Sequence, residues 1–443
     1  MKYGVWIIVL CTIAWSQDLQ KAIADRVDVS RKAVGIAAGV IGPEAREIVV
    51  HGCNDNKSEQ KLSKESTFEI GSISKVFTAL LFADMIERGE VKPDDPVSKY
   101  LPESVTVPSR NGKQITLLHL ATHVSGLPRL PGNLTPADPA NPYADYNAAK
   151  LYEFLSGYAL PRDPGEKHEY SNLGGGLLGH ALSRRAGKPY EELIRQRILE
   201  PLQMNETFVG AGPRLATGHS ADLRPAKPWD FQVLAPAGAI RSTVGDMLKF
   251  AGAHLDLTET PLKAAVARMR QAQAPVGAPD VDQAIGWLIF NNHGTEILLH
   301  DGGTAGFRSA LALDPARKRG VVVLANTAND VTDIALHELE PKYGLVRPAL
   351  PRKEIEAGEE LLETYVGVYQ LTPAFAITIF RKGKQLMAQA TNQPAFEVFP
   401  ESETKFFLKV VDAQISFTKN EAGKVVGLIL HQGGRDQKAT RTN

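Results

Sequence analysis

The distribution of apolar and polar positions divides the chain into two regions. In the first, apolar runs typical of strands lie near both ends, at 34–41, 47–52, 284–290, 296–300, 309–313 and 321–325. Between them the apolar positions recur with helical spacing, chiefly at 72–88, 148–156, 173–186 and 190–200. This order predicts one α+β domain over 17–345, with a sheet built from both ends of the segment.

A different pattern follows. Short strand-like runs separated by turn sequences occur at 376–380, 385–390, 405–410, 413–418 and 425–431. They predict a small antiparallel β domain over 361–443, either a sandwich or a barrel. The charged, proline-containing stretch 346–360 is interpreted as a linker between the two domains.

The N-terminus has the pattern of a secretory signal. Lys2 precedes an apolar run over 4–15, and Ala14-Trp15-Ser16 fits a cleavage site with small residues. We expect a signal peptide over 1–16 and a periplasmic or secreted protein without an integral membrane segment after cleavage. Retention of the segment as an anchor is the alternative.

Composition narrows the expected partners. The 443 residues are 43% hydrophobic and 23% charged, which is typical of a soluble globular protein. Lys and Arg together number 50, as do Asp and Glu, so nothing favours nucleic acid or an acidic membrane surface. The expected partner is a small-molecule or peptide substrate.

Four Ser-x-x-Lys tetrads are present, beginning at Ser58, Ser72, Ser402 and Ser416. Ser58 lies in a charged loop, and the last two lie in the predicted β domain, where this spacing puts the two side chains on opposite faces of a strand. Only Ser72 opens a long apolar helix, so Lys75 shares its helical face. A lysine base beside a serine at a helix N-terminus suits nucleophilic catalysis.

Tyr170-Ser171-Asn172 is the only Tyr-x-Asn in the chain, in a polar loop before a glycine-rich helix start. Tyrosine can pass a proton and asparagine can orient a substrate carbonyl. Tyrosine and lysine ordinarily titrate near pH 10, so a base role near pH 7 costs about 4 kcal/mol. Burial and mutual proximity must lower that cost.

A third motif, His300-Asp301-Gly302-Gly303, ends the strand-like run 296–300. Glycines at a strand edge let a substrate lie against the backbone. The backbone N–H groups of Gly303 and Ser72 are therefore candidates for an oxyanion hole.

These motifs, in this order, resemble the class C β-lactamase family, which includes DD-peptidases and β-lactamase-like esterases. The segments 68–75, 120–128 and 303–307 are also similar to family sequence, and the resemblance covers about 20–340. It implies a β-lactamase/transpeptidase-like fold, an antiparallel sheet flanked by helices with an all-helical region. The small β domain resembles domains appended to many members.

The resemblance also implies residue roles. Ser72 is the nucleophile, Lys75 its activator, and Tyr170 the proton shuttle and base for deacylation. Asn172, His300, Gly302 and Gly303 bind substrate, with Gly303 an oxyanion donor beside Ser72. No cofactor and no metal is expected.

The β-lactamases usually carry lysine where this chain has His300. Histidine is mostly neutral at pH 7, so a substrate carboxylate would be attracted less strongly, and more strongly as the pH falls below neutral. Three readings stay open: hydrolysis of β-lactam or related amide bonds, a carboxylesterase or D-amino-acid peptidase/DD-carboxypeptidase on the same scaffold, and a catalytically silent binding or assembly protein.

Two further patterns have simpler interpretations. His119 and His123 are four residues apart, but no His-Glu-x-x-His motif or third ligand accompanies them, which favours loop histidines over a metal pair. Glycines 174–176 follow no strand, and they are interpreted as sites of close helix packing.

Overall fold

The computed structural model describes residues 14–58, 60–346, 354–372, 375–391, 393–408, 413–432 and 435–442. It forms two compact units, Met1–Leu345 and Val346–Asn443. Most of the expected signal peptide and residues 347–353 of the expected linker lie outside the described residues, so both stay predictions. No helix in the described ranges is long and apolar enough to cross a bilayer.

The first unit is built on an eight-stranded antiparallel sheet in the order β10-β11-β12-β13-β14-β15-β1-β2. β1 lies beside β15, with Ala38 opposite Val323, so the predicted sheet from both ends of the segment is confirmed. The strands are β1 (Gly35–Ile41), β2 (Arg46–Gly52), β10 (Ala274–Pro275), β11 (Val281–Gln283), β12 (Leu288–Phe290), β13 (Ile297–Gly303), β14 (Arg308–Asp314) and β15 (Arg319–Ala325).

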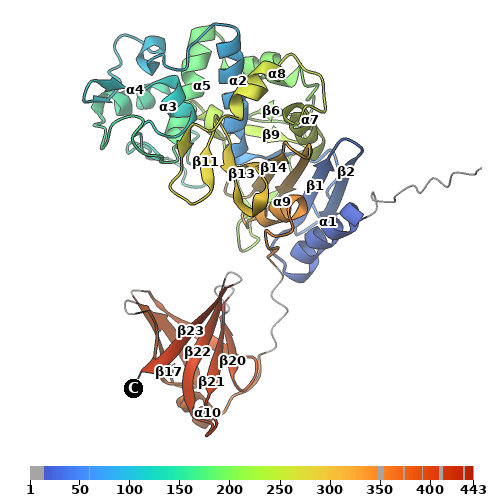
Figure 1. The fold of residues 1–443 in the computed structure, drawn as a ribbon, viewed down its shortest axis with the longest axis vertical. Helices are drawn as coiled ribbons and strands as arrows, with labels where there is room; N and C mark the ends of the chain where they lie inside the picture. The colour runs from blue at the N-terminus through green and yellow to red at the C-terminus, as the bar shows by residue number, and fades with distance from the viewer. Residues whose placement is uncertain are drawn as a thin grey trace, which may run out of the picture. The chain divides into compact units, whose positions relative to one another are not determined.

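Helices cover both faces of this sheet (Figure 1). α1 (Ala14–Ala24) and α9 (Thr332–Leu339) pack on one face, and α7 (Val244–His254) packs on the other, where α2 (Ser74–Glu87) and α8 (Lys263–Met269) complete the core. Because strand side chains alternate, Ile36 and Ala38 join the core under α1 and α9, while Ala37 joins the core under α7. Both faces of the central strands are therefore apolar and buried.

The all-helical region lies beside α2. It contains α3 (Leu117–Ala121), α4 (Ala148–Gly157), α5 (Asn172–Ala186) and α6 (Tyr190–Ile194). The predicted close packing at the glycines is confirmed, because a Cβ on Gly176 would lie 2.4 Å from Leu234. The predicted helix 190–200 ends earlier as an α-helix and continues as a π-helical turn, Arg195–Leu199.

One predicted strand is wrong over its first part, since only its last three residues are a strand, β12 (Leu288–Phe290). The run 284–290 is apolar throughout, but the structure places a turn inside it, between β11 and β12. Gly286 has φ +78° there, and a Cβ would lie 2.5 Å from Ala79 on α2. Burial against α2 explains the apolar sequence, which therefore gives no sign of the turn.

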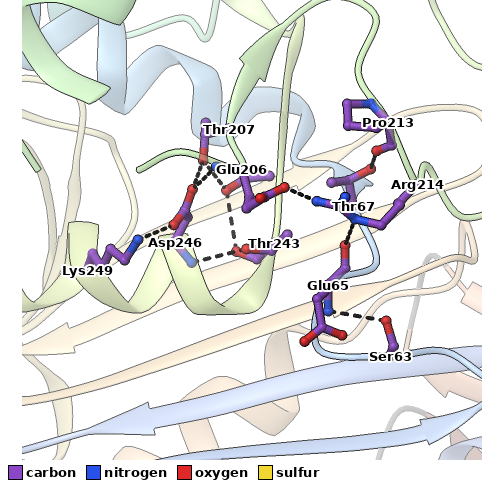
Figure 2. A network of polar contacts seen from close by, with 11 residues as sticks. Ser63, Glu65, Thr67, Glu206, Thr207, Pro213, Arg214, Thr243, Asp246 and Lys249 are labelled. Atoms are coloured by element: carbon purple, nitrogen blue, oxygen red, sulfur yellow. Dashed lines mark hydrogen bonds and ion pairs between the residues drawn. The ribbon is translucent and has the colours of Figure 1, made fainter. Parts of the chain in front are cut away.

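A three-stranded sheet, β3-β9-β6, leads into the start of α2. Its strands are β3 (Phe68–Glu69), β6 (Phe208–Val209) and β9 (Ile240–Ser242). Figure 2 shows a polar network next to this sheet. In it the buried carboxylate of Asp246 accepts hydrogen bonds from Glu206 N at 2.7 Å and from Thr207 Oγ1 at 3.0 Å. Nearby, Thr67 Oγ1 donates to Pro213 O at 2.8 Å, which ties the strand before Ser72 to the 206–214 segment.

Several short elements complete the first unit. They are the 3₁₀ turns Gly71–Ile73, Val97–Tyr100, Ala235–Ala237 and Asn292–Gly294, the π-helical turn Asp25–Val29, and the strands β4 (Ser109–Arg110), β5 (Lys113–Gln114), β7 (Gly218–His219) and β8 (Pro225–Ala226).

The second unit is a closed eight-stranded antiparallel barrel, which resolves the choice between sandwich and barrel. β16 closes it by pairing with β23, with Val368 opposite Thr442. Tyr365 and Phe417 stack in its core with ring centroids 4.1 Å apart. Its elements are α10 (Glu359–Thr364), β16 (Gly367–Thr372), β17 (Phe375–Lys382), β18 (Gln385–Ala390), β19 (Ala395–Pro400), β20 (Lys405–Leu408), β21 (Ala413–Lys419), β22 (Val425–Gln432) and β23 (Arg435–Thr442).

Candidate active site

Ser72 and Lys75 lie at the start of α2. Ser72 is in the 3₁₀ turn Gly71–Ile73, one turn before Lys75, and Lys75 Nζ lies 2.9 Å from Ser72 Oγ. Nζ also donates to the backbone oxygen of Ala237 at 2.7 Å. The predicted serine–lysine pair is therefore in hydrogen-bond contact, with the lysine held by a second, backbone partner.

The surroundings of Lys75 favour its neutral form. Burial, together with the positive charge of Arg129, lowers the pKa of Lys75 to about 7, and Asp301 opposes the shift. Gly175 on α5 makes room for the lysine stem, since a Cβ there would lie 3.2 Å from Lys75 Cε. A large fraction of Lys75 is therefore unprotonated near neutral pH.

Tyr170 and Asn172 enter the same site from the loop that leads into α5. Lys75 Nζ lies 5.0 Å from the centroid of the Tyr170 ring. Burial raises the pKa of Tyr170, and a hydrogen bond with Ser72 only partly opposes this. Tyr170 is thus a neutral phenol. Asn172 Oδ1 is buried and has no hydrogen-bond partner within the described chain, so it can accept one from a substrate.

The end of β13 lies directly against the turn that carries Ser72. A Cβ on Gly302 would lie 2.0 Å from Ile70 O, which itself accepts a hydrogen bond from Ser309 Oγ at 2.8 Å. A Cβ on Gly71, which has φ +50°, would lie 2.5 Å from Gly303 N. Glycine at these positions allows the two backbones to meet.

His300 is buried and neutral. Its Nδ1 lies 2.7 Å from the backbone oxygen of Asp301. Burial lowers the pKa of His300 to about 4, with Lys75 adding to the shift and Asp301 opposing it. We expected His300 to gain charge just below neutral pH, whereas this environment moves that gain to near pH 4.

These residues surround a cleft of about 310 Å³. Six of the seven predicted site residues line it, and Lys75 lies behind Ser72. The six are Ser72, Tyr170, Asn172, His300, Gly302 and Gly303.

Sequence reasoning missed several cleft residues. They are His123, Arg129, Tyr143, Trp229, Gln283, Asp301 and Arg308. Arg308 stands opposite Gly303 in the β13–β14 register, so this register was the one pattern that could have indicated it. Asp301 lies within the third motif on β13, Gln283 ends β11, and the remaining four come from loops distant in sequence.

Two arginines bring positive charge to the cleft. Arg308 Nε donates to Ala328 O at 2.9 Å, and its Nη1 lies 2.1 Å from where a Gly303 Cβ would stand. The Arg129 guanidinium lies 5.1 Å from the Tyr170 ring centroid. The absence of a side chain on Gly303 lets the Arg308 guanidinium lie on the cleft floor.

His119 and His123 have different structural roles. The His119 ring closes a capping box with Thr116 at the start of α3, whereas His123 lines the cleft. Over the described ranges no group of three or more His, Cys, Asp or Glu side chains could hold a metal ion.

A buried lysine in contact with a serine at a helix start is the arrangement of hydrolases that form an acyl-enzyme. The Beta-lactamase family matches residues 19–340. The chain therefore belongs to the β-lactamase family, and it is a serine hydrolase. Residues 351–441 match a second family, described as a Domain of unknown function (DUF3471).

Curated relatives agree with this assignment. The chain is 28% identical over 359 residues to the D-alanyl-D-alanine-carboxypeptidase/endopeptidase AmpH of Escherichia coli (strain K12), covering 76% of this chain and 92% of that protein. It is 29% identical over 335 residues to a Beta-lactamase of the same organism, covering 67% and 85%. Penicillin-binding protein 4* of Bacillus subtilis (strain 168) is 27% identical over 450 residues, covering 91% and 94%.

Solved structures share the fold. A Beta-lactamase/D-alanine Carboxypeptidase from Yersinia pestis has a TM-score of 0.62 at 27% identity, covering 74% of this chain and 99% of that one. A class C beta-lactamase has a TM-score of 0.65 at 21% identity, covering 73% and 95%. The β-lactamase/transpeptidase-like fold of the first unit is thereby confirmed.

Proposed function

We propose that this hydrolase cleaves amide bonds in small carboxylate-bearing substrates, β-lactams and peptides ending in D-alanine, through an acyl-enzyme on Ser72. The observation that carries the proposal is the 2.9 Å contact between Ser72 Oγ and a lysine whose pKa is about 7. The names of the relatives, β-lactamases and D-alanyl-D-alanine carboxypeptidases, support the substrate class.

Acylation begins when neutral Lys75 takes the proton from Ser72 Oγ, which attacks the substrate carbonyl carbon. The backbone N–H groups of Ser72 and Gly303, whose residues line the same cleft, stabilise the oxyanion. Tyr170 gives its hydroxyl proton to the leaving nitrogen and regains one from Lys75. The serine proton therefore ends on the departing amine.

Deacylation uses the same groups with water as the nucleophile. Because burial raises the pKa of Tyr170, a standing phenolate is disfavoured and Lys75 is the better base. Tyr170 relays the water proton to Lys75 while the oxygen attacks the Ser72 ester. The proton then returns to Ser72 Oγ, and the acid product leaves.

The charge in the cleft supports a carboxylate-bearing substrate. His300 cannot supply that charge near neutral pH, because its pKa is about 4. Arg308 lies beside Gly303 on the cleft floor, and a guanidinium pairs well with a carboxylate. Asn172 Oδ1 is available to accept the substrate amide N–H.

The space beside Ser72 favours a small acyl side chain. A hollow of about 20 Å³ lies between Ser72 and a wall that includes Tyr143, Trp229 and Phe231. That volume accommodates a group about the size of one water or methyl. An acyl group derived from alanine fits this hollow.

A carboxylesterase remains the second candidate, favoured by the neutral His300 at the position where β-lactamases usually have lysine. Activity on a D-Ala-D-Ala tripeptide, its C-terminal amide, nitrocefin and p-nitrophenyl acetate separates the two. We expect the free-acid peptide to exceed its amide in kcat/KM by about tenfold, the effect of one charged hydrogen bond. Equal values for the acid and the amide would favour the esterase.

A covalent-labelling experiment tests the silent-protein alternative. A fluorescent penicillin should label the wild-type chain covalently, and Ser72→Ala should abolish the label. If neither a penicillin nor a fluorophosphonate labels the chain in a Ser72-dependent way, acyl-enzyme hydrolysis is excluded.

We also propose that the protein acts outside the cytoplasm, because residues 1–16 have the pattern of a cleaved signal. The proposed domain organisation is a hydrolase domain over 17–345, a linker over 346–360 and a β domain over 361–443. We propose no nucleic-acid partner. N-terminal sequencing of the exported chain tests the cleavage after Ser16.

A further inference from the structure

His123 makes contact with both sides of Tyr170. Its backbone oxygen accepts a hydrogen bond from Glu169 N at 2.7 Å, and its ring Nδ1 accepts one from Ser171 N at 3.2 Å. The residue before Tyr170 and the residue after it are thus bound by one histidine. The His123 ring also lies against the Tyr170 ring, with centroids 4.5 Å apart and planes tilted by 39°.

The backbone of His123 is in an unusual conformation. Its φ of +58° lies in the left-handed region, which is uncommon for residues other than glycine, although histidine, asparagine and aspartate adopt it more often than the rest. Such a residue persists where its surroundings hold it, and it often marks a functional site. The loop is fixed around it, because Gly165 N donates to Val124 O at 2.7 Å and Val124 N donates to His119 O at 3.0 Å.

The hydrogen bond from Ser171 also sets the protonation state of His123. A backbone N–H can only donate, so Nδ1 must be unprotonated and the ring proton must lie on Nε2. Burial lowers the pKa of His123 well below its usual value, and the charges of Lys75 and Arg129 add to this shift, as do His168 and His300. The ring is therefore a neutral acceptor across the working pH range.

We propose that His123 is a positioning residue that fixes the Tyr170 hydroxyl between Ser72 and the substrate's leaving group. The inference rests on the proton-shuttle role given to Tyr170 in the proposed function. His123 acts through Tyr170: its carbonyl and Nδ1 hold the backbone on either side, and its ring limits the tilt of the phenol. Displacement of a catalytic group by about 1 Å can cost a hundredfold in rate.

Three substitutions separate the backbone conformation from the acceptor. Asparagine tolerates a positive φ, and its Oδ1 can replace Nδ1 as acceptor for Ser171 N. Glycine also tolerates the positive φ but has no side-chain acceptor for Ser171 N. Alanine neither tolerates the positive φ nor has an acceptor. We expect kcat to fall about 30- to 100-fold in His123→Gly and further in His123→Ala, with His123→Asn restoring it to within about threefold. KM should change little.

A buried histidine elsewhere controls for lost stability. His254 on α7 is fully buried, and its Nδ1 lies 3.0 Å from Phe250 O. His254→Gly should lower Tm without the selective loss of kcat. If His123→Gly retains kcat within threefold of wild type, or if His123→Asn is as slow as His123→Gly, the positioning role is wrong.

A double-mutant cycle tests whether His123 acts through Tyr170. In a Tyr170→Phe background the phenol can no longer carry a proton, so His123→Gly should cause no further loss of kcat. Additive losses would contradict the proposal. A Tyr170→Phe variant with wild-type kcat would instead remove the shuttle role on which the proposal rests.

A second readout is independent of activity. In a chain labelled with 3-fluorotyrosine, the ¹⁹F resonance of Tyr170, assigned from its absence in Tyr170→Phe, should stay sharp in wild type and His123→Asn and shift or broaden in His123→Gly. An unchanged resonance in His123→Gly would overturn the positioning role, even for a chain in which no hydrolysis is found.

Discussion

Lys75 Nζ lies 2.9 Å from Ser72 Oγ, while the rest of the lysine side chain is buried between α2 and Gly175 of α5. The spacing of three residues puts both side chains on one helical face. Burial then changes the chemistry of the pair, because the pKa of Lys75 falls to about 7. The sequence contains the spacing, and the packing of α5 makes the lysine a usable base.

The lowered pKa of Lys75 predicts a pH dependence. Only the unprotonated amine can accept the Ser72 proton, so kcat/KM should rise with pH through about 7 and level off above it. Lys75→Arg keeps the positive charge at every accessible pH and should lower kcat/KM by about 10³-fold. The pH profile of fluorescent-penicillin acylation measures both effects. A profile that is flat from pH 5.5 to 8.5 would contradict the role of Lys75 as base.

The sequence was sufficient for most of the site because its motifs are local. Ser72 and Lys75 share one helical turn, and Tyr170 and Asn172 share one loop, so short patterns fix these relationships. Arg308 could not be found in this way. Its place beside Gly303 depends on strand register and on a missing Cβ, which are properties of the folded sheet.

Removal of the Arg308 charge should change substrate preference. Arg308→Gln keeps a polar side chain but loses the guanidinium, and we expect kcat/KM for the free-acid D-Ala-D-Ala peptide to fall about 10- to 100-fold. Hydrolysis of p-nitrophenyl acetate should stay within about twofold, because that substrate has no carboxylate. Arg224, which is exposed and pairs with exposed Asp222, provides the matched control Arg224→Gln. An equal loss on both substrates would assign Arg308 to folding instead.

The histidines show a second limit of sequence reasoning. His119 and His123 were both interpreted as loop histidines, and the structure separates them. His119 caps α3, whereas His123 reaches the cleft because its positive φ turns the chain back toward Tyr170. Outside glycine, no local sequence pattern marks a residue with positive φ, so the position of His123 was not predictable.

Asp246 should be important for stability because it satisfies several buried donors (Figure 2). Its carboxylate accepts from Glu206 N and Thr207 Oγ1, and Lys249 Nζ lies 2.7 Å away. Asp246→Ala leaves Glu206 N unpaired and leaves Thr207 Oγ1 with Ser242 Oγ, 2.8 Å away, as its remaining partner, and we expect a loss of about 2 kcal/mol in the free energy of unfolding. Lys249→Ala removes a partly exposed ion pair and the hydrogen bond from Nζ to Gln203 O, and it should cost about 1 kcal/mol. Chemical denaturation measures both. Equal costs would mean that the ion pair, and not the buried hydrogen bonds, is what matters.

The barrel illustrates why some strands were missed. Five of its eight strands alternate apolar and polar residues clearly enough to be predicted. Three strands, β16, β19 and β23, were not predicted. β23 contains few apolar residues, and it is a strand because it pairs with β22 and β16, which closes the barrel. Closure is a long-range requirement that no local pattern records.

The aromatic wall beside Ser72 predicts a limit on acyl size. Phe231 stacks on Tyr143 with ring centroids 4.8 Å apart, and both residues line the hollow of about 20 Å³ next to Ser72. Phe231→Ala removes one of the three aromatic side chains of that wall, so longer acyl chains should fit. We expect the ratio of kcat/KM for p-nitrophenyl butyrate to that for the acetate to rise about tenfold, the effect of one or two methylenes in an apolar pocket.

Phe154 provides the control for this experiment. It stacks on Tyr158 at 4.9 Å, a similar arrangement of phenylalanine on tyrosine, but it does not line the cleft or the hollow. Phe154→Ala should therefore lower stability without changing the butyrate-to-acetate ratio. If the two variants change the ratio equally, the wall does not set acyl size. If neither changes it, the acyl group must lie toward the Arg129 side of the larger cleft.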